Sequence, residues 1–234
     1  MRRYLIFAVA FAVAAVCVRL GMWQLDRRAQ RQARNDLVAS RLAMAPLELT
    51  ADYSDPDSLD FRRASVRGSF DFERQIVVVA RSYNGTPAVN VVTPLRVTGG
   101  GAVLVERGHA LSPDARTVDL EALVEPDSSV AVGVLLPVEG EVAPAHGWPR
   151  YVRRANPIEL EAAYPYALFP LLLRRTQLPA AAPKNLAVVP LPELTGGPHL
   201  SYAIQWFSFA LIAVVGSVVL FLRSSGERQP AQAS

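Results

Sequence analysis

A histidine and two aromatic residues stand at regular spacing where a long apolar run begins near the C-terminus. His199, Tyr202 and Trp206 follow one another at intervals of three and four residues, so a helix over this segment would bring them to one side. An imidazole nitrogen is a good ligand for a transition metal or for haem iron, and aromatic rings make good walls for a flat cofactor. These three residues form the first candidate binding site, with His199 as the metal ligand.

A second group of candidate residues lies where the N-terminal apolar run ends. Trp23 is followed by Arg27 and Arg28. If both runs cross a membrane and both termini lie on one side, this group stands at the same depth as His199. Together the two groups offer an imidazole for iron, aromatic faces for a porphyrin and guanidinium groups for its propionates, which is what a haem site needs.

Each of these residues also has a simpler interpretation. Tryptophan and tyrosine gather at membrane–water interfaces without binding any ligand. His199 follows a Gly-Gly-Pro turn, where an imidazole can merely cap a helix or face water. Gln24 and Gln205, near the same two helix mouths, are expected to form hydrogen bonds between helices.

The N-terminal apolar run, residues 4–20, is interrupted only by Arg19. As a helix it spans about 26 Å, close to the hydrocarbon thickness of a bilayer. A cleaved signal peptide shares the basic start and the apolar stretch, but no polar mature start follows here. We therefore expect an uncleaved transmembrane helix over residues 1–25 that continues as a helix to about residue 42.

The second apolar run, residues 200–222, holds no charged residue. It spans about 34 Å as a helix, which predicts a second transmembrane helix over residues 199–223. A short cytoplasmic tail, residues 224–234, is expected to follow it.

Arginines mark the orientation of the two spans. By the positive-inside rule, the arginines at the outer ends of the runs place both termini in the cytoplasm: Arg2, Arg3, Arg223 and Arg228. A cluster of four arginines within residues 27–34 argues the other way, but it borders a long connection, and long domains cross largely regardless of charge. We expect the middle domain outside the inner (plasma) membrane of the cell.

The middle of the chain, residues 43–198, predicts a β-rich domain. Valine-rich segments bounded by turn residues predict strands at 63–70, 75–81, 89–97, 102–108, 130–138 and 168–176. Asn156 before Pro157 is typical of a helix start. Short turns between strands favour antiparallel pairing. The expected fold is an α+β membrane protein in which two transmembrane helices flank an extracytoplasmic, mainly antiparallel β domain, a sheet or a barrel, with one or two helices.

Composition and motif content exclude several classes of function. Hydrophobic residues make up 51% of the chain and charged residues 19%, which fits membrane helices joined to a polar domain. Cys17 is the only cysteine, so disulfides within the chain and Cys–Cys metal sites are excluded. The net charge of +3 comes without the aromatic-interleaved basic run of a nucleic-acid module. Since no catalytic motif is present either, we expect neither an enzyme nor a nucleic-acid-binding protein.

Five short motifs, in order along nearly the whole chain, resemble the Surfeit locus protein one family, which includes assembly factors for haem–copper oxidases. The mouth of the first helix reads GMWQLDRR (residues 21–28), like the family's Gly-x-Trp-Gln-Leu-x-Arg pattern. FRRASVRGSF (61–70), TPL (93–95) and VLVERG (103–108) resemble its strand motifs. HLSYAIQWF (199–207) resembles its His-Leu-x-Tyr-Ala-x-Gln-Trp pattern at the second span.

The resemblance implies an assembly factor for cytochrome c oxidase with no catalytic chemistry of its own. It implies that the protein helps haem a to reach the largest, haem-bearing oxidase subunit, and it makes haem a synthase a further candidate partner beside the lipid bilayer. In bacterial members the histidine that opens the second span is the proposed haem ligand, and it corresponds to His199. Arg27 or Arg28 would then lie near the propionates.

Three alternatives stay open beside this hypothesis. The chain can be a haem-free membrane scaffold that stabilises an oxidase subunit during assembly. A membrane-tethered hydrolase is a third class, without any local signature. His109 stands where the family commonly has tryptophan; it is a candidate second ligand, but we expect a histidine in an exposed loop.

Overall fold

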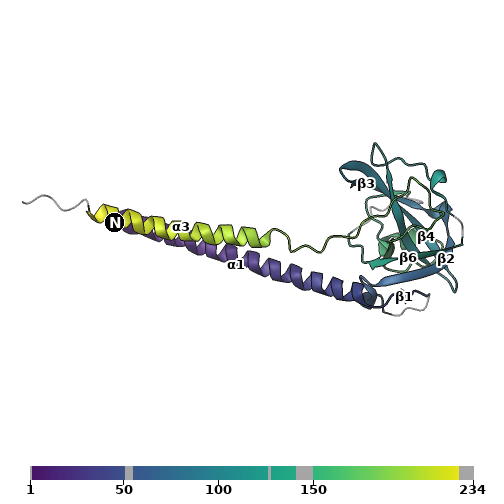
Figure 1. Cartoon of the computed structure of the whole chain (residues 1–234), viewed down its shortest axis with the longest axis horizontal. Coiled ribbons are helices and arrows are strands. Elements are labelled where there is room, and N and C mark those ends of the chain that lie inside the picture. The colour runs from purple at the N-terminus through teal and green to yellow at the C-terminus, as the bar shows by residue number, and fades with distance from the viewer. Residues whose placement is uncertain (1, 51–54, 126–127, 141–149, 227–234) are drawn as a thin grey trace, which may run out of the picture. The chain divides into compact units, whose positions relative to one another are not determined.

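The computed structural model describes residues 2–50, 55–125, 128–140 and 150–226, and the chain divides into two compact units. One unit comprises Met1–Leu37 and Glu193–Ser234, and the other comprises Val38–Pro192. The first unit holds two long helices and the second holds the β-sheet (Figure 1). The predicted fold, with two apolar helices flanking a mainly antiparallel β domain, is confirmed.

Helices α1 (Arg2–Ala43) and α3 (His199–Gly226) run side by side (Figure 1). Both are long and apolar enough to cross a membrane, over Leu5–Ala43 and His199–Arg223. Helix α1 ends one residue beyond the predicted end, and α3 continues into the predicted tail, of which residues 227–234 lie outside the described part of the chain.

Small side chains line the contact between the two helices. Ala14 and Cys17 of α1 are buried against Ala210 of α3. A Cβ atom on Gly21 would lie 2.6 Å from the Phe207 ring, so any larger residue here would force that ring to shift. Small residues let the backbones of membrane helices come close, and van der Waals packing then holds them.

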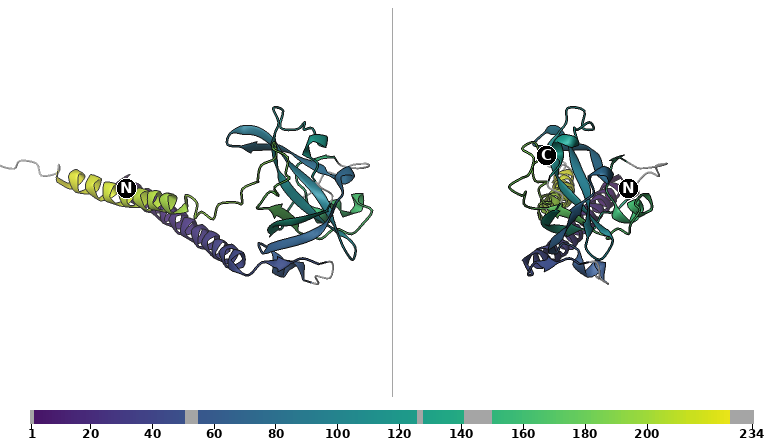
Figure 2. Two further views of the ribbon diagram at one scale, coloured as in Figure 1. Left: turned by 45° about the vertical axis from the view of Figure 1, so that its right-hand side comes forward. Right: turned by 90° about the vertical axis from the view of Figure 1, so that its right-hand side faces the viewer.

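The β domain is an eight-stranded sheet in the order β1-β2-β6-β8-β5-β4-β3-β7. The strands are β1 (Leu47–Glu48), β2 (Arg63–Phe70), β3 (Ile76–Tyr83), β4 (Thr86–Val97), β5 (Ala102–Leu111), β6 (Ser128–Leu136), β7 (Tyr151–Val152) and β8 (Leu172–Arg175). Because β2 also pairs with β4, the strands β2-β6-β8-β5-β4 close into a small barrel (Figure 2). Pairing is antiparallel except in β1–β2, β3–β7 and β5–β8.

Each barrel strand sends apolar side chains into one shared core. Val66, Leu95, Val105, Leu135 and Leu173, one from each of the five strands, belong to the same buried cluster. Along β2, buried Ala64 and Val66 alternate with partly or fully exposed neighbours, which is the period-two pattern of a strand with one buried face.

The remaining elements are short. They are η1 (Pro56–Leu59), η2 (Phe72–Arg74), η3 (Glu121–Leu123), α2 (Pro157–Leu160) and η4 (Glu161–Ala163). The predicted helix start at Asn156 is confirmed, because its side chain accepts a hydrogen bond from the backbone N–H of Ile158 at 3.2 Å. The strand predicted over residues 168–176 is shorter in the structure, where β8 comprises Leu172–Arg175.

Candidate functional site

His199 is the first residue of α3 and lies against the side chain of Gln24 on α1. Its Nδ1 atom is 2.9 Å from Oε1 of Gln24, and the pair is partly buried. Within the described residues, no hydrogen bond engages Nε2 of His199. The prediction that Gln24 forms a hydrogen bond between the helices is confirmed, whereas Gln205 is exposed on α3.

The segment that leads into His199 is attached to α1 through one carbonyl group. The carbonyl oxygen of Thr195 accepts hydrogen bonds from Arg31 Nε at 2.8 Å and from Asn35 Nδ2 at 3.0 Å. Gly197 then turns the chain with φ +66°, a conformation that glycine adopts at little cost. These contacts set where α3 begins, and therefore where the imidazole lies beside α1.

The predicted aromatic residues divide between two environments. Trp206 is partly buried and packs against the cluster of small residues between the helices. Tyr202 and Trp23 are 47% and 44% exposed and project away from that contact. The structure therefore brings His199 and Trp206 to the seam between the helices, with Trp23 and Tyr202 on outward faces.

The two predicted arginines lie on the exposed surface of α1. The guanidinium of Arg27 lies 5.7 Å from the centre of the Trp23 ring and donates a hydrogen bond to Gln30. Arg28 is exposed. Both guanidinium groups thus remain accessible near the mouth of the helix pair.

The donor chemistry of this site fits haem better than a bare metal ion. Among the described residues there is no group of three or more His, Cys, Asp or Glu side chains that could hold a metal ion. A haem iron takes four nitrogen ligands from its own porphyrin, so one imidazole suffices to attach it to a protein. Nε2 of His199, which has no hydrogen-bond partner among the described residues, would be the nitrogen to hold it.

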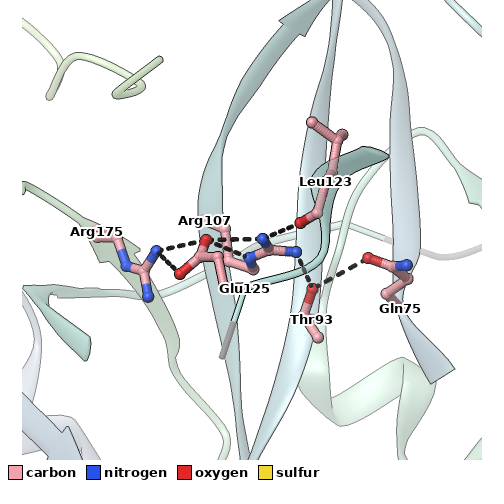
Figure 3. Close-up of polar contacts among 6 residues, drawn as sticks. All are labelled: Gln75, Thr93, Arg107, Leu123, Glu125 and Arg175. Atoms are coloured by element: carbon pink, nitrogen blue, oxygen red, sulfur yellow. Dashed lines mark hydrogen bonds and ion pairs between the residues drawn. The ribbon is translucent and has the colours of Figure 1, made fainter. Parts of the chain in front are cut away.

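A second polar cluster, which the sequence did not predict, lies inside the β domain. The carboxylate of Glu125 lies between the guanidinium groups of Arg107 and Arg175 (Figure 3). Arg107 Nη2 is 2.7 Å from Glu125 Oε1, Arg175 Nη1 is 2.9 Å from Oε2, and all three side chains are fully buried. Burial lowers the pKa of Arg107, and the Glu125 carboxylate counteracts that shift.

Aromatic rings and backbone groups complete the surroundings of this cluster. Arg107 also donates to the carbonyl oxygen of Leu123, and both guanidinium groups lie 5.5 Å from the centre of the Phe70 ring. The one sequence signal is the position of Arg107 shortly after the apolar run Ala102–Val105 of the same strand, where a buried arginine has to find an internal partner.

His109 corrects an expectation from the sequence. It lies in strand β5 and is 4% exposed, so the prediction of a histidine in an exposed loop is wrong. Its backbone N–H donates to the carbonyl of Ala187, and its ring stacks on Tyr83 with the centroids 3.8 Å apart. The segment around Ala187 covers this end of β5, and burial lowers the pKa of the imidazole. The third histidine, His146, lies outside the described residues.

The chain is similar to proteins of one family. The SURF1 family model matches residues 11–211. An uncharacterised SURF1-like protein of Mycobacterium tuberculosis is 30% identical over 217 residues, which cover 89% of this chain and 78% of that protein. Surfeit locus protein 1 of Takifugu rubripes is 28% identical over 143 residues, covering 53% of this chain and 58% of that protein. The region matched by the family model includes both Gln24 and His199.

Proposed function

Because the chain belongs to the SURF1 family, which is associated with cytochrome c oxidase assembly, we propose that it holds haem a transiently and assists its insertion into the largest oxidase subunit. The SURF1 family is a family of assembly factors rather than a known enzyme family. In the proposed role the chain binds and releases a cofactor and catalyses no reaction.

The observation that carries the haem proposal is the state of His199. Its Nδ1 is engaged by Gln24 and its Nε2 has no hydrogen-bond partner among the described residues. When bound, haem supplies an iron that accepts an axial nitrogen ligand. His199 is positioned to provide that ligand, and the exposed arginines Arg27 and Arg28 are available for the negatively charged propionates.

A single protein ligand suits a transient carrier. A haem held by two strong axial ligands dissociates slowly, and affinity differences between related complexes lie mostly in the dissociation rate. One imidazole at the mouth of a helix pair allows the cofactor to pass to a subunit that offers better coordination. A haem a synthase in the same membrane is the proposed source of the cofactor.

The proposed location follows from the same two helices. They are long and apolar enough to cross a bilayer, and arginines lie next to both outer ends. By the positive-inside rule both termini are cytoplasmic and the β domain lies outside the plasma membrane. This orientation places His199 and Trp23 on the outer side, where the first helix leaves and the second helix enters the bilayer.

One observation favours a second candidate function, a haem-free scaffold. Trp23 and Tyr202 are exposed on outward faces of the helices, where aromatic side chains make good anchors for a partner protein. In that case the chain stabilises an oxidase subunit by direct contact, and His199 serves only to join the two helices through Gln24.

The test is complementation of cells that lack this chain, with the haem a content of the assembled oxidase as the readout. We expect wild type to restore the haem a content and His199→Ala to leave it low, although the variant still reaches the membrane and co-purifies with the oxidase subunit. Gln205→Ala, a change at an exposed glutamine of the same helix, is the control and should behave as wild type. Full haem a content with His199→Ala would support the scaffold and contradict the carrier.

A further inference from the structure

We infer that Gln24 is the positioning residue of His199: its amide oxygen accepts the Nδ1–H of the imidazole, fixes that tautomer and leaves the Nε2 lone pair for the ligand. The part of this inference that concerns haem rests on the proposed function. The part that concerns the tautomer stands on the geometry of the two helices alone.

The direction of the hydrogen bond follows from the atoms involved. Nδ1 of His199 lies 2.9 Å from Oε1 of Gln24, and an amide oxygen can only accept. A neutral imidazole has one N–H donor and one lone-pair acceptor. An acceptor at Nδ1 therefore places the proton there, and the lone pair stays on Nε2.

The packing of the helices brings the two side chains to this distance. Gly21 lets α1 approach the Phe207 ring, and Gln24 follows Gly21 by about one helical turn. On α3, His199 precedes the buried Ala203 by about one turn. Gln24 and His199 thus lie in the contact between the two helices, about one turn beyond Gly21 and Ala203.

Hydrogen bonds to the lead-in segment fix the backbone that precedes His199. Arg31 and Asn35 both donate to the carbonyl of Thr195, and Ser201 Oγ donates to the carbonyl of Pro198 at 2.7 Å. Both contacts fix the backbone next to His199. Gln24 remains the described residue that engages the imidazole itself.

A partner on the second nitrogen of a metal-binding histidine has a known effect. It fixes the tautomer and the ring orientation and raises the basicity of the ligand, and its removal typically lowers metal affinity about 10- to 100-fold. Gln24→Ala should weaken haem binding by this factor, while Gln24→Glu keeps an acceptor oxygen at a similar distance and should preserve binding.

The first experiment reads the tautomer in haem-free full-length protein in detergent. Imidazole ¹⁵N chemical shifts distinguish protonated from unprotonated ring nitrogens, and with three histidines in the chain the His199 signals are assigned by loss in His199→Ala. We expect protonated Nδ1 in wild type and in Gln24→Glu, and a mixture with Nε2–H in Gln24→Ala. Gln205→Ala, the same substitution at the exposed glutamine of α3, is the control and should leave the signals unchanged.

The second experiment titrates wild type, Gln24→Ala, Gln24→Glu and Gln205→Ala with haem and follows the absorbance band. Loss of affinity in Gln24→Ala, with recovery in Gln24→Glu, supports the positioning role. Protonated Nε2 in the wild type, or unchanged haem affinity in Gln24→Ala, overturns it. If the wild type shows the expected tautomer but binds no haem, the carrier function fails and the tautomer assignment stands, so the two failures are distinguishable.

Discussion

Two buried arginines share one buried carboxylate inside the β domain, and this unequal charge sets the energetics of the barrel interior. Glu125 contacts both Arg107 and Arg175, while Nε and Nη2 of Arg175 have no hydrogen-bond partner among the residues that the structure describes. Desolvation makes a buried charge expensive unless an opposite charge lies beside it. Loss of the Glu125 carboxylate would therefore leave both guanidinium groups buried without their counter-charge.

Replacing that carboxylate should destabilise the domain strongly. Glu125→Gln leaves two buried guanidinium groups without a counter-charge, and we expect the free energy of unfolding to fall by about 3–5 kcal/mol. Denaturant titration in detergent, followed by circular dichroism of the β-sheet, measures the change. Glu121→Gln, at an exposed position in the same segment, is the matched control; equal effects of the two substitutions would contradict the role of Glu125.

His109 should make the stability of the domain depend on pH. Burial holds the pKa of its imidazole below the ordinary value of 6.5, so the unfolded chain binds the proton more readily than the folded one. Its contribution is fully present above pH 6.5 and is lost as the pH falls from there toward the folded pKa. Unfolding measured between pH 5 and 8 should show this loss in wild type and a flatter profile in His109→Gln. The same pH profile in both proteins would show that His109 does not cause the pH dependence.

At the scale of elements, glycine residues permit the closest backbone contacts. A Cβ atom on Gly68 of β2 would lie 2.2 Å from the carbonyl oxygen of Arg96 on β4, at the pairing that closes the barrel. Backbone atoms cannot move aside as the end of a side chain can. The absence of a side chain at Gly68 is thus a condition for closure.

Gly68→Ala should therefore weaken the β2–β4 contact specifically. Overpacking of this kind costs about 1–3 kcal/mol, and the N–H groups of β4 opposite Gly68–Phe70 should lose protection in hydrogen exchange. Ser69→Ala, at the next and exposed residue of β2, should leave both quantities unchanged. Normal protection of β4 in Gly68→Ala would show that the barrel closes without this glycine.

Local pattern predicted the elements better than their pairing. Apolar length predicted both long helices, which are long and apolar enough to cross a membrane. The strand predicted over residues 63–70 coincides with β2, Arg63–Phe70. The β2–β4 closure and the parallel β5–β8 pair join segments far apart in the chain, and no local residue pattern specifies such partners. The two-residue strands β1 and β7 are too short to show any periodicity.

The residues of the candidate site were chosen from the sequence, and their arrangement could be predicted only in part. A shared helix face was expected for His199, Tyr202 and Trp206. The seam with α1 instead passes through His199, Ala203, Trp206 and Ala210, and Tyr202 lies about 60° around the helix from His199. The buried state of His109 depends on the distant segment at Ala187, which no motif around His109 could reveal.

At the scale of the whole molecule, two membrane-length helices and a β domain with its own core form separate units. The helical unit contains His199 together with all the residues that fix its position. The β domain is held together by its barrel core and its buried charges. The residues proposed to handle the cofactor thus belong to the helical unit, and the β domain has a core of its own.

The absorbance spectrum of the purified protein, produced in cells that make haem a, tests the central claim most directly. Wild type should carry a haem band, and His199→Ala should lack it. A wild-type spectrum without haem, or an unchanged band in His199→Ala, would contradict the carrier function proposed for this chain.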